Sequence, residues 1–111
     1  MSQSNFPPYL LIVIAEIDAT VEDDWNRWYD DVHLPAALAC PGVISGQRYK
    51  SAGVLSLTDH GARAVSATVS YAAVYEVSGP EALETPEFKE MAGWYEFTGH
   101  IKARTQVFQQ R

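Results

Sequence analysis

The apolar run from Tyr9 to Ile17 constrains the fold of this chain more than any other stretch of its sequence. Leu, Ile and Val dominate the run, Pro8 precedes it and Asp18 follows it. It is about half the length needed to cross a bilayer, and no basic region or small-residue cleavage site precedes it. We therefore expect neither a membrane span nor a signal peptide. The run is typical of a strand that is buried on both faces.

A helix is predicted to follow over residues 21–33. The segment Thr20-Val-Glu-Asp23 has the form of a capping box, in which the Thr20 hydroxyl accepts a hydrogen bond from the Asp23 amide. Pro35 limits the regular hydrogen bonding, so residues 35–39 add at most a short turn before the stop signal Cys40-Pro-Gly42. One face of this helix carries Val21, Trp25, Trp28, Tyr29 and Val32.

The rest of the chain repeats this order of elements. Residues 43–50, 68–77 and 101–108 predict strands, and the small, polar stretch 51–64 predicts a long loop. After a short helical turn at Gly79-Pro80, Thr85-Pro-Glu87 caps a second helix that Gly99 ends. The apolar stripe of that helix is Phe88, Met91, Ala92 and Tyr95.

The order β-α-β-β-α-β predicts a ferredoxin-like α+β fold, with a four-stranded antiparallel sheet and two helices on one face. Because the chain has 111 residues, we expect a single domain over residues 1–111. A sheet this apolar, covered on one face only, exposes a large hydrophobic surface. Packing that surface against a second copy is the usual remedy, so a homodimer is predicted.

Composition disfavours several kinds of partner. The net charge of −6 disfavours nucleic acid and anionic membranes. Cys40 is the only cysteine, which excludes an internal disulfide and a thiolate metal cluster and fits a reducing, cytoplasmic location. The sequence has no glycine-rich phosphate loop, P-loop or nucleophile elbow, so no nucleotide cofactor is expected.

The segment Trp25-Asn-Arg-Trp-Tyr-Asp-Asp-Val-His-Leu-Pro35, followed by Cys40-Pro-Gly-Val43 and Gln47-Arg-Tyr49, resembles the EthD-like branch of the dimeric α+β barrel superfamily. Residues 28–35 are its most specific part. The resemblance implies a ferredoxin-like dimer with a pocket between sheet and helices. It leaves the reaction open, because the superfamily includes polyketide cyclases, isomerases, decarboxylases, dehydratases, cofactor-free oxygenases and haem enzymes.

His33 is the leading catalytic candidate. It lies near the end of the predicted helix, and an imidazole suits proton transfer at a carbonyl or hydroxyl substrate. Asp30 shares its side of the helix and can orient the ring or raise its pKa, whereas Asp31 is expected to be solvated. The alternative is structural, with His33 capping the helix or bonding a backbone carbonyl. The EthD-like motif, which keeps a histidine here, favours the functional role.

Other side chains are candidates for the same pocket, each with a packing alternative. An aromatic stripe on a helix can wall a flat substrate or simply join the core, as is expected of Trp25. Arg48 and Tyr49 have opposite parity on their strand, so only one of them points inward. The predicted catalytic groups are His33, Asp30 and Tyr75, and the predicted substrate-binding groups are Trp28, Tyr29, Arg48, Tyr71 and His100.

Glu16 and His60 are two further candidates that are not assigned to the site. A buried carboxyl at Glu16 would have a raised pKa, but an exposed strand end is the expected place for it. His60 lies in the predicted loop and is expected to be exposed. Neither His60 nor His100 stands at a metal-ligand spacing from His33, so neither a metal nor a haem is expected.

Two functions of different class fit these residues. The first is a cofactor-independent lyase or isomerase, of dehydratase, decarboxylase or cyclase type, with His-centred acid/base chemistry on an aromatic, polyketide-like or other carbonyl compound. The second is a non-catalytic dimer that binds a small hydrophobic molecule. A cofactor-free monooxygenase is a third reading. The number of polar candidates favours the enzyme.

Overall fold

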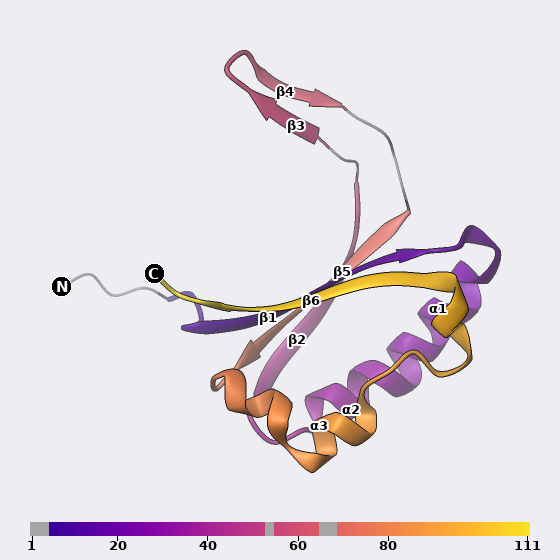
Figure 1. Ribbon diagram of the computed structural model, residues 1–111, viewed down its shortest axis with the longest axis vertical. Helices are drawn as coiled ribbons and strands as arrows, with labels where there is room; N and C mark the ends of the chain where they lie inside the picture. Colours follow the sequence, from indigo (N-terminus) through magenta and orange to yellow (C-terminus); the bar gives the residue numbers. More distant parts are fainter. Residues whose placement is uncertain (1–4, 53–54, 65–68) are drawn as a thin grey trace.

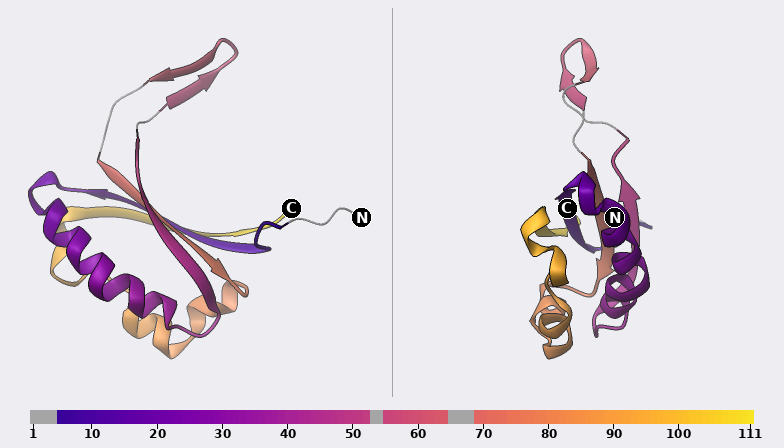
Figure 2. Two further views of the ribbon diagram at one scale, coloured as in Figure 1. Left: turned by 180° about the vertical axis from the view of Figure 1, so that it is seen from behind. Right: turned by 90° about the vertical axis from the view of Figure 1, so that its right-hand side faces the viewer.

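Four antiparallel strands form a sheet in the order β2-β5-β1-β6. The computed structural model describes residues 5–52, 55–64 and 69–111. All its helices lie on one face of the sheet (Figures 1 and 2). This is the predicted ferredoxin-like arrangement. The four strands are β1 (Tyr9–Ile17), β2 (Val43–Lys50), β5 (Ser70–Val77) and β6 (Ile101–Gln109).

The first helical segment is longer than predicted and has an irregular centre. A 3-10 turn at Ala19–Val21 leads into α1 (Glu22–Trp28), a π-helical turn at Tyr29–His33 and α2 (Leu34–Leu38). The Leu34 N–H donates to the carbonyl of Tyr29, five residues earlier. This wide turn comes just before Pro35, whose missing N–H costs little at the start of α2. His33 is therefore in the middle of a helical segment and not at its end.

The π turn also changes which residues face the sheet. Trp25, Tyr29, His33 and Ala37 are all buried, at steps of four residues. In a regular α-helix each such step overshoots one turn by ~40°, so three steps would carry a side chain well around the helix. The wider turn compensates, and it leaves Val32, which was predicted to face the core, 56% exposed.

The predicted capping box at Thr20 is wrong. Asp18 caps the 3-10 turn instead, because its carboxylate accepts from the Thr20 N–H at 3.1 Å. The Thr20 hydroxyl donates to the same oxygen at 3.0 Å. The acidic first turn of α1 has no side-chain cap from Val21, its N-cap residue.

The stretch predicted as a loop contains a hairpin. Strands β3 (Leu55–Thr58) and β4 (Gly61–Ala64) pair with each other and stand away from the main sheet (Figure 1). A two-residue turn joins them, and the φ of +114° at Gly61 suits glycine. Residue 68, the predicted start of the next strand, lies outside the described residues.

The second helix begins as predicted and ends early. Thr85 caps α3 (Pro86–Met91), its hydroxyl accepting from the Phe88 N–H at 3.1 Å. A turn with Gly93 at φ +114° stops the helix, six residues before Gly99. Tyr95 is therefore off the predicted apolar stripe and is 69% exposed.

In the described part of the chain, helices cover one face of the sheet and leave the other open. Leu11, Ala15 and Ile17 of β1 are buried under the helices, beside Tyr75 and Val77 of β5. The opposite face of β1 carries apolar residues that no described helix covers, so the expectation of a strand buried on both faces holds for one face only. We define the open face by Leu10, Ile12, Ile14, Val74 and Phe108. Among the described residues, no helix is long and apolar enough to cross a membrane.

Candidate functional site

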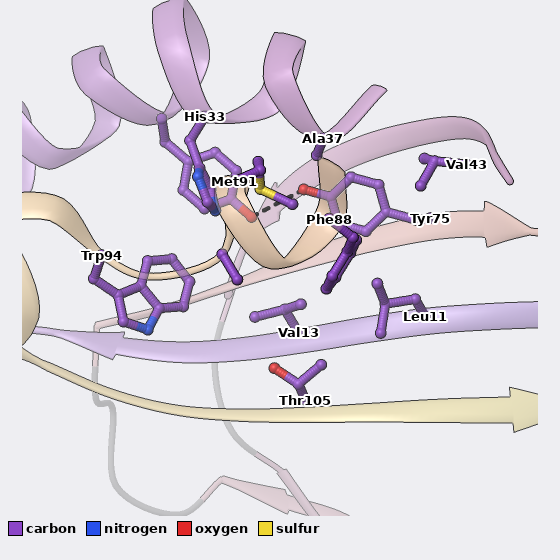
Figure 3. Close-up of a pocket in the computed structure, with 12 residues that line it drawn as sticks. Leu11, Val13, His33, Ala37, Val43, Tyr75, Phe88, Met91, Trp94 and Thr105 are labelled. Carbon is purple, nitrogen blue, oxygen red and sulfur yellow. Dashed lines mark hydrogen bonds between the residues drawn. The ribbon is translucent and has the colours of Figure 1, made fainter. Parts of the chain in front are cut away.

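A cavity of about 110 Å³ lies between the helices and the inner face of the sheet. Helical residues line one wall, α3 and the chain after it line another, and four strands supply the floor (Figure 3). The exposed residues Ala92 and Thr105 mark the mouth. The lining residues are Leu11, Val13, Tyr29, His33, Ala37, Val43, Tyr75, Phe88, Met91, Ala92, Trp94 and Thr105.

His33 is the ionisable imidazole of this cavity and sits among aromatic rings. Trp28 stacks on it at 4.6 Å between ring centroids, and Tyr29 meets it edge-on at 4.7 Å. Only 8% of His33 is exposed, and no hydrogen bond joins its ring to any described residue. Burial, aided by the positive charge of Arg48, lowers the pKa of His33 to about 4. The ring is thus neutral at neutral pH and free to accept a proton.

Two tyrosine hydroxyls lie beside His33 in the cavity wall. Tyr29 Oη and Tyr75 Oη are 3.0 Å apart, so one donates to the other and the acceptor keeps its own hydrogen for a third atom. Burial is the main reason why the pKa of each phenol is raised. Gly46 of β2 makes room for this pair, because a Cβ there would lie 2.5 Å from the Tyr75 ring.

Asp30 is not a partner of His33, contrary to the sequence prediction. Its carboxylate accepts from Arg48 Nη1 at 2.6 Å, and 60% of its side chain is exposed. The reason is the fold: β2 brings Arg48 to the helix at the point where Asp30 projects. The expected rise in the pKa of His33 is therefore replaced by a fall.

Arg48 is the member of the Arg48–Tyr49 pair that points inward, while Tyr49 is 57% exposed. Its guanidinium lies over the ring of Tyr29, with Cζ 4.1 Å from the centroid. It does not line the cavity, because it lies behind Tyr29.

Tyr71 and Tyr75 are four residues apart on β5 and share a face of the sheet, but Tyr71 lies in a different environment. Its hydroxyl donates to Glu22 at 2.5 Å and accepts from the Asn26 amide at 2.9 Å. Asn26 in turn accepts from Arg48 at 2.7 Å. Tyr71 is therefore part of a hydrogen-bonded network outside the cavity.

The remaining sequence candidates are also separated from the cavity. His100 faces Asp18 at 3.5 Å at the far end of the sheet, where it is exposed. Trp28 backs His33 without lining the cavity, and Glu16 is exposed. Of the predicted site residues, the structure brings together His33, Tyr29 and Tyr75.

The cavity contains residues that sequence reasoning passed over. Phe88 and Met91 were assigned to an apolar stripe, which gave a signal for burial but none for a cavity. Thr105 faces inward because it pairs with Val13, and that register cannot be read from β6 alone. Trp94 lies beyond the end of α3, so helical periodicity could not place it.

Within the described residues, no group of three or more His, Cys, Asp and Glu side chains is placed to hold a metal ion. Cys40 is buried, and its thiol donates to the Ala36 carbonyl at 3.3 Å. The lining side chains that can donate or accept a hydrogen bond are His33, Tyr29, Tyr75, Trp94 and Thr105.

No protein-family model and no curated protein matches this sequence. Solved structures match its fold. HapK from Hahella chejuensis has a TM-score of 0.63 and 16% identity, covering 93% of this chain and 92% of its own. An EthD family protein from Bacillus halodurans has a TM-score of 0.61 and 11% identity, with coverage of 93% and 99%. SnoaB, a cofactor-independent oxygenase from Streptomyces nogalater, has a TM-score of 0.60 and 13% identity, with coverage of 94% and 94%.

The chain thus has a ferredoxin-like fold, which these solved structures share. An EthD family protein is among the structures that share it, so the resemblance drawn from residues 25–49 is confirmed at the level of the fold. With identities of 11–16%, these structures share a fold with this chain, and a shared fold does not determine the reaction.

Proposed function

We propose that this protein is a cofactor-independent enzyme, a lyase or isomerase, that moves a proton on a small aromatic or other carbonyl compound. The observation that supports this most is His33, a buried imidazole with no hydrogen bond to the described residues, in a cavity that is otherwise largely apolar. Polar groups that converge in an apolar cavity are typical of a small-molecule site.

In this proposal neutral His33 is the base. Its lowered pKa keeps the ring unprotonated at neutral pH, ready to take a proton from carbon or oxygen of the substrate. Negative charge then collects on the substrate oxygen, and the free O–H of the Tyr29–Tyr75 pair donates to it. The protonated imidazole returns the proton to another atom, which completes an isomerisation or assists loss of a leaving group.

The size of the cavity favours a compound of about one ring. Its volume of about 110 Å³ is somewhat below the ~150 Å³ of an apolar protein cavity that admits benzene. A larger substrate, such as a polyketide, would have to extend through the mouth between Ala92 and Thr105.

Two alternatives share this cavity. SnoaB shows the fold in a cofactor-independent oxygenase, and removal of a proton by His33 also suits the first step of such a reaction. A non-catalytic binder is supported by the mostly apolar lining. Incorporation of ¹⁸O from labelled O₂ into the product would identify the oxygenase. A ligand that binds and is recovered unchanged would identify the binder.

Exchange of carbon-bound hydrogen tests the proposal without knowledge of the natural substrate. Cyclohexanone, one ring with one oxygen, is incubated with protein in D₂O, and loss of its α-protons is followed by NMR. We expect the protein to accelerate exchange and His33→Gln, which keeps most of the side-chain volume, to lose roughly 10²–10⁴-fold of that rate. Bound cyclohexanone with no accelerated exchange would instead support the binder.

We also propose that two copies pack through the open face. Leu10, Ile12, Ile14, Val74 and Phe108 form an apolar surface that no described helix covers. Light scattering should give twice the chain mass of 12.3 kDa. Val74→Asp should lower that mass, whereas Val32→Asp, at an exposed apolar residue on the helical side, should not.

A further inference from the structure

We propose that Arg48 is a positioning residue that acts through Tyr29 and makes the Tyr29–Tyr75 hydroxyl pair a receptor for an anionic oxygen, such as that of a phenolate or enolate. The inference rests on the proposed function in one respect, since it concerns the same cavity. It concerns the charge of the ligand that the cavity binds and does not depend on turnover.

The first support is that Arg48 is held in one place. Nη1 donates to Asp30 at 2.6 Å and Nη2 donates to Asn26 at 2.7 Å, from two successive turns of the helical segment. Only 9% of the Arg48 side chain is exposed. A guanidinium fixed at two of its nitrogens and packed among rings keeps a constant distance from the cavity.

The second support is the place of Tyr29 between Arg48 and His33. The Tyr29 ring lines the cavity on the His33 side and also lines a narrow gap that holds Arg48. The guanidinium Cζ is 4.1 Å from the Tyr29 centroid, and the His33 ring meets the same tyrosine at 4.7 Å. Arg48 therefore lies one aromatic ring away from the cavity without touching a ligand in it.

The third support is that the positive charge is only partly cancelled. Asp30, its counter-charge, has 60% of its side chain in water, where solvent screens it. The neighbouring carboxylate Glu22 is taken by Tyr71 and by Lys50 at 3.2 Å. The field of Arg48 thus persists toward the cavity, whose lining is mostly apolar.

The fourth support is the effect of the Arg48 charge on the pKa values of Tyr29, Tyr75 and His33. Arg48 counteracts the burial that raises the pKa of Tyr29 and Tyr75, and it disfavours a proton on His33. The effect on the two tyrosines favours negative charge in the cavity wall, and the effect on His33 opposes positive charge there. A phenolate or enolate oxygen that accepts the free O–H of the pair gains the same stabilisation.

Ionisation of a bound phenol tests this inference. The probe is 4-fluorophenol, and its ¹⁹F shift reports the bound neutral and ionised forms across a pH titration. The wild-type protein should bind the phenolate more tightly than the phenol. Arg48→Met should cancel about a tenfold preference for the anion, an effect typical of one opposite charge nearby.

A control variant and a variant that should increase the preference for the phenolate complete the test. Lys50→Met removes a cation from the same face of β2 that contacts Tyr71 and not Tyr29, and it should leave the preference unchanged. Asp30→Asn leaves Arg48 in place without its counter-charge and should increase the preference. Arg48→Lys, which keeps the charge, should retain part of it.

Three results would overturn the inference. One is a wild-type protein that fails to bind the phenolate more tightly than the phenol. Another is an equal effect of Lys50→Met and Arg48→Met, which would show a general surface field. The third is an unchanged or reduced preference in Asp30→Asn. None of these depends on cyclohexanone exchange, so a binder without catalysis can still satisfy the inference, and an exchange catalyst can still fail it.

Discussion

Two clusters of polar side chains lie on the inner face of the sheet, and they differ in how fully their hydrogen-bonding groups are used. The surface network, formed by Glu22, Asn26, Asp30, Arg48 and Tyr71, pairs each of its members with another. In the cavity wall, formed by Tyr29, His33 and Tyr75, no described residue forms a hydrogen bond with the imidazole, and one hydroxyl hydrogen of the tyrosine pair has no acceptor among them. Each cluster contains residues that were predicted for the site from the sequence, so residue type alone does not tell the two clusters apart. What distinguishes the cavity wall is that it has hydrogen-bonding groups without a partner among the described residues, in a cavity that is mostly apolar.

The largest expected effect comes from removing one hydroxyl from each cluster. Tyr75→Phe deletes a donor from the cavity wall and should reduce α-proton exchange of cyclohexanone by roughly 10²–10³-fold, as loss of an oxyanion donor does. Tyr71→Phe should leave the exchange rate nearly unchanged and lower the free energy of unfolding by about 1–2 kcal/mol through its two lost hydrogen bonds. Equal rates in the two variants would show that the clusters do not differ in role.

A change at Gly46 should disturb the cavity wall through its packing alone. A Cβ at this position would meet the Tyr75 ring at 2.5 Å, so Gly46→Ala has to displace that ring. We expect a loss of about 1–3 kcal/mol in the free energy of unfolding and a longer Tyr29–Tyr75 distance in a crystal structure. Gly99→Ala is the control, because a Cβ there meets nothing within 4 Å.

The unused imidazole should also make stability depend on pH. Since the pKa of His33 is about 4 in the folded protein and near its ordinary 6.5 when unfolded, the unfolded chain binds the proton more tightly. The contribution of His33 is therefore fully present above pH 6.5, and the free energy of unfolding should fall by up to about 1.4 kcal/mol per pH unit as the pH drops toward 4. Denaturant titrations should show that slope in the wild type and a shallower one in His33→Gln.

The smallest effect is expected at the exposed edge of the surface network. Asp30→Asn removes an ion pair whose acid is mostly in water, so the free energy of unfolding should change by less than about 1 kcal/mol. Denaturant titrations of the wild type and of Asp30→Asn measure this difference. A clearly larger loss would show that the Asp30–Arg48 pair stabilises the fold more than its exposure suggests.

The four strands of the main sheet and the start of α3 follow local rules, and the sequence predicts them well. Thr85 caps its helix and Gly42, at φ +85°, makes the predicted turn, because both depend on neighbouring residues only. The Asp30–Arg48 pair joins positions 18 residues apart along the chain. Helical spacing predicts that Asp30 lies near His33. Only the packing of β2 against the helix shows that Asp30 pairs with Arg48 instead. Of the cavity residues, Tyr29 and Tyr75 lie on faces that local periodicity defines, whereas His33 was found through the chemistry of its side chain and the EthD-like motif.

The π turn at Tyr29–His33 has a consequence for the comparison of this chain with others of its fold. A π turn holds one residue more than the α-helical turn it replaces. A related chain with a regular helix here would therefore match this one on both sides of the turn only if its alignment carries a one-residue gap within 29–33. An ungapped alignment would pair His33 with a residue on another side of the helix. Tracing the histidine through distant relatives thus requires superposed backbones, with the gap placed where the helix widens.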